Sequence, residues 1–182
     1  MTPPRDPARP RTEKELVERT ARFLDARGYR TYPDPDGTDY FDLVARKGTE
    51  VGLVEAKLGD ARALLGQALR RRPWGNWVAV VLPSRRLAER LVRETSGRRA
   101  APVGVWLLER GELLELRPAR TFPLGPEGED PFAPLRVRIH RVLDRIDRGE
   151  IPEGVPWDGV ISEVRRASGG RSFSEWRLDE GV

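Results

Sequence analysis

The chain has 182 residues, of which 38% are hydrophobic and 34% are charged, and its formal net charge is +4. It contains no Cys and a single His, which excludes disulfides and thiolate metal sites and argues against zinc and His-dependent nucleophilic catalysis. Any metal must therefore be bound by oxygen, which favours Mg²⁺ or Mn²⁺. No apolar run is long enough to span a membrane and no signal peptide is recognisable, so we expect a cytoplasmic protein with no membrane partner.

The first part of the chain predicts a helix and a short strand. Thr12 and Glu15 form a capping box, which marks a helix start, and Gly28 is typical of a helix stop. A Pro- and Asp-rich turn follows the strand. The elements expected here are, in order, a disordered basic arm at 1–11, a helix at 12–27, a strand at 29–32 and a turn at 33–37.

Residues 42–57 predict a β-hairpin, because strand-favouring residues flank a turn. If residues 48–49 form the two-residue loop, the strand register sets Asp42 directly across from Glu55. Side chains two apart on a strand share a face, so Lys57 joins Glu55 on the side that carries Asp42. The sequence therefore predicts two carboxylates and an amine close together.

Two carboxylates that face each other across a strand pair repel, unless a divalent cation lies between them. The alternative is a surface hairpin whose charges serve only solubility. Against that alternative, Glu55 and Lys57 lie among apolar residues on both strand faces, where an unpartnered charge is costly. Only three of the 33 basic residues are Lys, so a Lys at 57 indicates a need for a compact, titratable amine.

These residues resemble the PD-(D/E)XK nuclease superfamily, which has the restriction-endonuclease-like fold. Asp42 is followed after twelve residues by Glu55-Ala56-Lys57 and then by a helix that bears Gln67, the only Gln of the chain. The resemblance is to the RecB-like and Holliday-junction-resolvase-like branches and covers roughly residues 12–119. It implies an α/β fold with an αβββαβ core, a mixed central sheet flanked by helices, and a small, mainly helical C-terminal appendage beyond that core.

The resemblance also implies a catalytic site. Asp42, Glu55 and the backbone carbonyl of Ala56 would hold one or two Mg²⁺ or Mn²⁺ ions. Lys57 would orient or help deprotonate the nucleophile and stabilise developing negative charge, and Gln67 would contact the substrate or support the site.

In the family, a Glu from the first helix can join the metal ligands. We expect Glu18 in this role, because its competitor Glu15 already serves as a cap; a solvated helix face is the alternative for both. Asp39 is a rival ligand near Asp42, but a regular strand would put it on the opposite face.

The second half of the expected nuclease domain carries a basic cluster. Its elements are predicted to be a helix over 60–72, a buried strand over 76–82, a helix that begins at Ser84 and a hairpin over 103–116. Arg70, Arg71 and Arg72 could bind a DNA backbone, or form a solvated helix end favoured by the helix dipole. The resembled branch typically has Tyr where this chain has Arg71, a departure that weakens the assignment to that branch and adds a phosphate-seeking charge.

Beyond a linker at 121–134, an amphipathic helix presents Arg138, Arg141 and Arg145 as a basic stripe, which could lie along phosphates or simply be solvated. The C-terminal segment could form a winged-helix module, a lid or a dimerisation arm, and the last would make a homodimer. The expected organisation is an arm at 1–11, a nuclease-like domain at 12–120, a linker at 121–134 and a helical module at 135–182.

We therefore expect a metal-dependent nuclease that hydrolyses DNA phosphodiester bonds in repair or defence, with RNA as the alternative substrate. Two other classes stay open. One is a non-catalytic nucleic-acid-binding protein on the same fold. The other is a regulatory protein of a defence or mobile-element system that acts through protein partners.

Overall fold

The computed structural model describes residues 9–33, 41–97, 102–121 and 133–151. Its helices and strands are α1 (Glu13–Ala26), β1 (Arg30–Pro33), β2 (Leu43–Lys47), β3 (Glu50–Ala56), α2 (Ala61–Arg71), the 3-10 turn η1 (Arg72–Trp74), β4 (Trp77–Leu82), α3 (Arg85–Thr95), β5 (Gly104–Glu109), β6 (Glu112–Arg117) and α4 (Ala133–Asp147). Most of the predicted arm, of the predicted linker and of the predicted C-terminal module lies outside these ranges.

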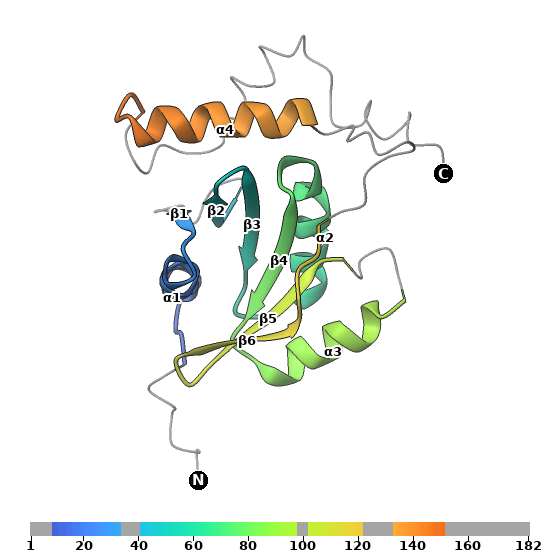
Figure 1. Ribbon diagram of the computed structural model, residues 1–182. Coiled ribbons are helices and arrows are strands. Elements are labelled where there is room, and N and C mark those ends of the chain that lie inside the picture. The colour runs from blue at the N-terminus through green and yellow to red at the C-terminus, as the bar shows by residue number, and fades with distance from the viewer. Residues whose placement is uncertain (1–8, 34–40, 98–101, 122–132, 152–182) are drawn as a thin grey trace.

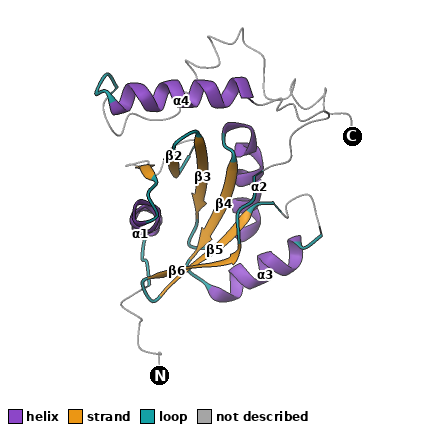
Figure 2. Cartoon of the chain, viewed as in Figure 1, coloured by secondary structure: helices purple, strands orange, loops and turns teal. Residues whose placement is uncertain are grey.

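The six strands form one sheet in the order β1-β2-β3-β4-β5-β6. The first three strands make an antiparallel meander, β4 and β5 are parallel to β3, and β6 returns antiparallel to β5 (Figures 1 and 2). The predicted α/β class, with a mixed sheet flanked by helices, is confirmed.

The register predicted for the hairpin is also confirmed. Val44 pairs with Leu53, and Lys47 pairs with Glu50 across the turn. Gly48 adopts a φ of +58°, a conformation that glycine takes at little cost, so the local sequence favours a turn at this point. The position of the turn sets the register of the two strands, and the register determines which of their side chains share a face of the sheet.

The sheet is covered on both faces. Helix α1 packs its apolar stripe on one face, where Leu16 and Leu24 are buried against β2, β3 and β4. On the other face, α2, α3 and α4 cover a second cluster that includes Leu53, Val80 and Leu143. Strands β3 and β4 are thus buried on both sides, as their continuous apolar runs predict.

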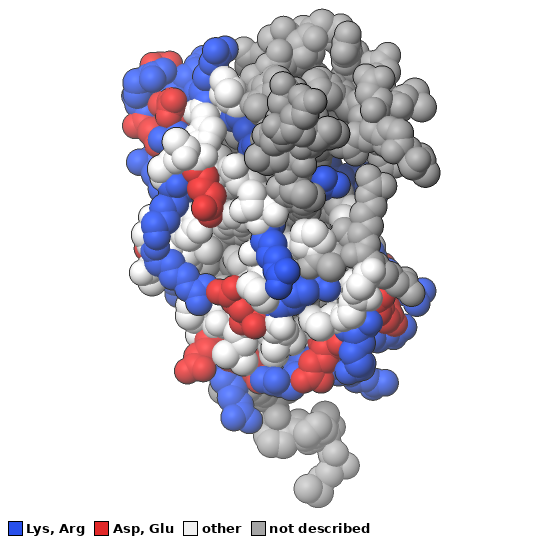
Figure 3. Space-filling model, turned by 45° about the vertical axis from the view of Figure 1, so that its right-hand side comes forward, with Lys and Arg blue, Asp and Glu red and all other residues white. Residues whose placement is uncertain are grey.

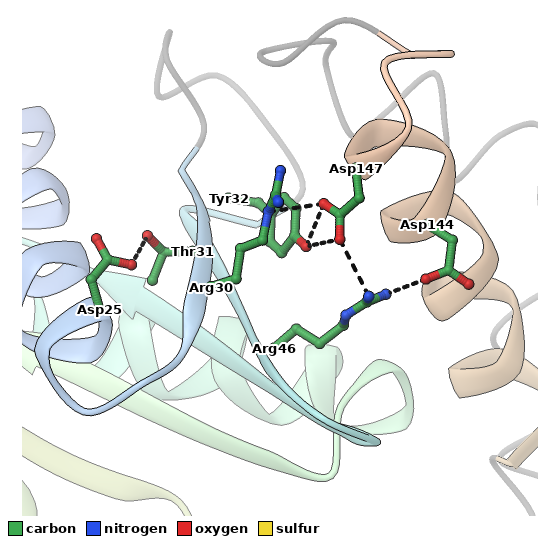
Figure 4. A network of polar contacts seen from close by, with 7 residues as sticks. All are labelled: Asp25, Arg30, Thr31, Tyr32, Arg46, Asp144 and Asp147. Atoms are coloured by element: carbon green, nitrogen blue, oxygen red, sulfur yellow. Dashed lines mark hydrogen bonds and ion pairs between the residues drawn. The ribbon is translucent and has the colours of Figure 1, made fainter.

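Helix α4 packs directly on this second face, although the sequence placed it in a module beyond a linker. Ile139 is 3% exposed and Leu143 is fully buried, so both belong to the core of the sheet. Its C-terminal turn is held by charge (Figure 4): Asp144 pairs with Arg46 at 2.6 Å, and Asp147 pairs with Arg30 at 2.9 Å. The core of the sheet therefore includes at least the described part of the predicted module.

In the part of the chain that the structure describes, no helix has the length and apolar character needed to cross a membrane.

Truncation of Leu143 tests whether α4 is part of the core. We expect Leu143→Ala to lower the free energy of unfolding by about 2–5 kcal/mol, because it leaves a cavity in a closed cluster. The matched control is Val137→Ala on the same helix, whose side chain is 49% exposed and whose effect should stay within about 0.5 kcal/mol. Urea unfolding of the full chain would measure both, and equal small effects would show that α4 does not share the core.

Candidate active site

The hairpin brings Asp42 and Glu55 together at the end of the central strands. Leu43 pairs with Val54, so one further step of the register sets Asp42 against Glu55. The amide of Ala56 donates a hydrogen bond of 2.7 Å to Oδ2 of Asp42, which fixes the carboxylate on the residue just ahead of β2. The predicted pair of carboxylates is therefore formed, and it lies at the carboxyl end of β3.

Glu55 is a buried charged residue on an apolar strand, with 2% of its surface exposed. Its Oε1 lies 3.3 Å from Nε of Arg71, which α2 contributes. Burial, followed by the negative charge of Asp42, raises the pKa of Glu55 to about 8, although Arg71 and Lys57 act in the opposite direction. Carboxyl groups with a pKa shifted this far are concentrated at functional sites, because folded proteins rarely bury two acids side by side without a functional reason.

Lys57 lies one residue beyond β3 and extends the parallel pairing, since its amide donates to the carbonyl of Val81 at 3.2 Å. Its Nζ donates a hydrogen bond of 3.0 Å to Glu13 in the first turn of α1. Burial alone would lower the pKa of Lys57, but the hydrogen bond and charge of Glu13, together with Asp42 and Glu55, raise it. The side chain is therefore an ammonium at neutral pH, suited to stabilising negative charge rather than removing a proton.

Helix α2 presents two polar residues on the face that meets Glu55. It begins as predicted, with Oδ1 of Asp60 accepting from the amide of Ala63 at 3.1 Å. Gln67 lies one turn before Arg71, and its amide oxygen is buried and has no hydrogen-bond partner among the residues that the structure describes. Such an acceptor is costly to leave unsatisfied, so a water or a ligand group is the natural partner.

The acid that α1 contributes is Glu13, not Glu18. Residues of a helix are 100° apart, so Glu13 lies one turn ahead of Val17 on the stripe that faces the sheet, whereas Glu18 points away and is exposed. Glu15 is engaged elsewhere, because it accepts from the Arg11 amide and pairs with Arg19. Extension of the buried stripe by one turn towards the N-terminus would have selected Glu13 from sequence. Asp39 lies outside the described residues.

The predicted basic residues lie on α2 and α4. Arg70 is exposed and Arg72 is half-buried where α2 ends and leads into η1, and of these three arginines it is Arg71 that pairs with Glu55. Over the described part of the face in Figure 3, basic and acidic side chains are interspersed, without a broad patch of one sign.

Helix α4 lies at the end of the sheet opposite Asp42, where its His140 ring contacts the Thr49 carbonyl at 3.1 Å beside the hairpin turn (Figure 1). The exposed residues Arg141 and Arg145 are therefore not brought to the acidic pair, and Arg145 also pairs with Glu150 at 3.5 Å. The side chain of Arg138 lies outside the described residues.

The donor set fits a hydrated magnesium ion. Among the residues that are described, no three His, Cys, Asp or Glu side chains form a group that could hold a metal. Mg²⁺, however, usually keeps several waters and takes one or two carboxylates, which Asp42 and Glu55 supply. The unsatisfied oxygen of Gln67 offers an acceptor for a bound water.

No protein-family model and no curated protein matches the chain. Among solved structures, a protein of unknown function from Silicibacter pomeroyi superposes with a TM-score of 0.44 at 16% sequence identity, over 79% of this chain and 95% of that chain. A likeness at this score carries no argument about the fold or the function.

The raised pKa of Glu55 predicts a stability that falls as pH rises. Between its usual pKa of 4.5 and about 8, the unfolded chain has lost a proton that folded Glu55 retains, so folding weakens across this window in metal-free buffer. The effect should be on the order of a few kcal/mol. Urea unfolding from pH 4 to 9 should show this slope in the wild type and in Glu18→Gln, a control at an exposed Glu, but not in Glu55→Gln. An unchanged slope in Glu55→Gln would contradict the assignment.

Proposed function

We propose that the chain is a metal-dependent nuclease that hydrolyses DNA phosphodiester bonds. The observation that carries this proposal is the pair Asp42 and Glu55 at the end of β3. The Lys57 ammonium lies near enough to this pair for both carboxylates to raise its pKa. A surface hairpin with charges for solubility does not explain a Glu that is 2% exposed beside another carboxylate.

The order of elements supports a restriction-endonuclease-like fold. The run α1-β1-β2-β3-α2-β4 follows the αβββαβ pattern, and β1, β2 and β3 form its antiparallel meander. Asp42 immediately precedes the second strand, and Glu55-Ala56-Lys57 runs from the end of the third strand to the residue just beyond it. These positions support the proposal, because the resembled fold carries its acid and its E-x-K motif on the second and third strands of the meander.

Each residue then has a role that follows from its surroundings. A Mg²⁺ or Mn²⁺ ion bound by Asp42 and Glu55, with the Ala56 carbonyl as a further oxygen, would lower the pKa of its water and neutralise charge on the scissile phosphate. The Ala56 amide holds Asp42 in position. The Lys57 ammonium stabilises the negative charge that develops on the phosphate oxygens.

Contacts to the rest of the nucleic acid would come from α2 and α4. Exposed Arg70 lies on the helix that borders the site and could bind a phosphate near the scissile bond. Arg141 and Arg145 on α4 would meet phosphates farther along a duplex, since they lie beyond the hairpin turn. Phosphate contacts of this kind carry no sequence information, so we propose weakly selective or structure-selective cleavage.

Removal of the Lys57 amine tests the proposal. Cleavage of single-stranded, duplex, flapped and four-way-junction DNA would be measured with Mg²⁺, with Mn²⁺ and with EDTA. We expect metal-dependent cutting that falls by about 100-fold to 1000-fold in Lys57→Ala, as when one donor to a developing negative charge is removed. The matched control is Lys47→Ala, at the far end of the same hairpin, which should cut like the wild type.

Salt-sensitive binding without cutting in the wild type would replace the nuclease with a non-catalytic nucleic-acid-binding protein. Neither binding nor cutting, or equal losses in both Lys variants, would count against any role for Lys57 in catalysis.

A further inference from the structure

The guanidinium of Arg71 is a fixed positive charge beside the acidic pair, Asp42 and Glu55. Its Nε lies 3.3 Å from Oε1 of Glu55, and the side chains of the two residues are only 12% and 3% exposed. Its guanidinium also lies over the ring of Phe41, 5.9 Å from the centroid. A side chain held in this way is not a mobile surface arginine that waits for substrate, because both its charge and its flat face are already engaged.

The cluster is nearly balanced in charge. Three carboxylates, those of Glu13, Asp42 and Glu55, stand against the two cations Lys57 and Arg71, which leaves a single net negative charge when all are ionised. One divalent cation would turn this excess into a single positive charge. A second would add two more positive charges beside Arg71 and Glu55, whose burial strengthens the repulsion between like charges.

The geometry of Glu55 also opposes a second ion. Two-metal sites hold their ions about 3.5–4 Å apart, and a carboxylate between them must offer its oxygens to both. Oε1 of Glu55 lies 3.3 Å from the buried Nε of Arg71, so a second ion that approached this oxygen would meet a fixed positive charge. Glu13, the further acid near the site, is engaged with the Lys57 ammonium at 3.0 Å.

We infer that the acidic pair holds one divalent cation, and that the Arg71 guanidinium takes the place of a second. This inference rests on the proposed function, which leaves the number of ions open. Arg71 is a positioning residue, because it acts through Glu55: it balances the charge of the carboxylate and engages the oxygen that would otherwise bridge to another ion.

Manganese binding to the full chain tests the inference without any measurement of activity. Electron paramagnetic resonance would count bound Mn²⁺ and show whether neighbouring ions are magnetically coupled. We expect one uncoupled ion in the wild type and none at this site in Asp42→Asn. Arg71→Gln removes the charge at nearly constant polarity and should bind a second, coupled ion, whereas Arg71→Lys keeps the charge and should bind one.

Arg70→Gln is the matched control, because it removes the exposed neighbouring arginine and should leave the count at one. Two coupled ions in the wild type would overturn the inference and leave the nuclease standing, provided that Mn²⁺ still supports cleavage. A count of one in folded Arg71→Gln would show that Arg71 does not exclude the second ion. No bound ion in the wild type, together with no metal-dependent cleavage, would overturn both the inference and the proposed function.

Discussion

The structure of the site depends on one constraint, a carboxylate buried in the middle of an apolar sheet. Strand β3 is covered on both faces, so the charge of Glu55 cannot be solvated there and must be matched by neighbouring groups. Arg71 of α2 supplies positive charge, as does Lys57, which Glu13 of α1 holds, whereas Asp42, just ahead of β2, adds a second negative charge beside Glu55. The end of β3 is therefore the point at which four separate segments are fixed relative to one another.

Local signals in the sequence were sufficient to predict the hairpin and its consequences. A two-residue loop with glycine at position 48 sets the register, and the register alone places Asp42 against Glu55. The cap at Asp60 and the continuous apolar run of β4 are equally local, and both elements were predicted within a few residues. These features follow from backbone conformation and periodicity, so they do not require knowledge of what packs against them.

Long-range contacts were not predictable in the same way. Glu13 was not among the expected acids, because its place depends on which side of α1 faces the sheet, and the amphipathic spacing shows this only when the apolar stripe is followed to the first turn. The charge of Arg71 is evident from the sequence but its partner is not, because its contact with Glu55 joins residues on different elements. The apolar side of α4 was recognised, yet nothing local indicated that Leu143 would complete the core of the sheet rather than that of another unit.

The two apolar cores explain how the fold can tolerate the acidic pair. A pKa of about 8 for Glu55 means that, without a cation, the folded chain retains a proton at neutral pH instead of placing two negative charges side by side. Under the proposed function, a metal ion must displace this proton, so metal binding and deprotonation are coupled. Arg71 partly compensates the negative charge of Glu55 and so lowers the cost of ionising it in the folded chain. The apolar cores on both faces of the sheet provide the stability that offsets the rest of this cost. A buried carboxylate whose ionised form is unfavourable until a cation binds is expected of a binding site rather than of a structural ion pair.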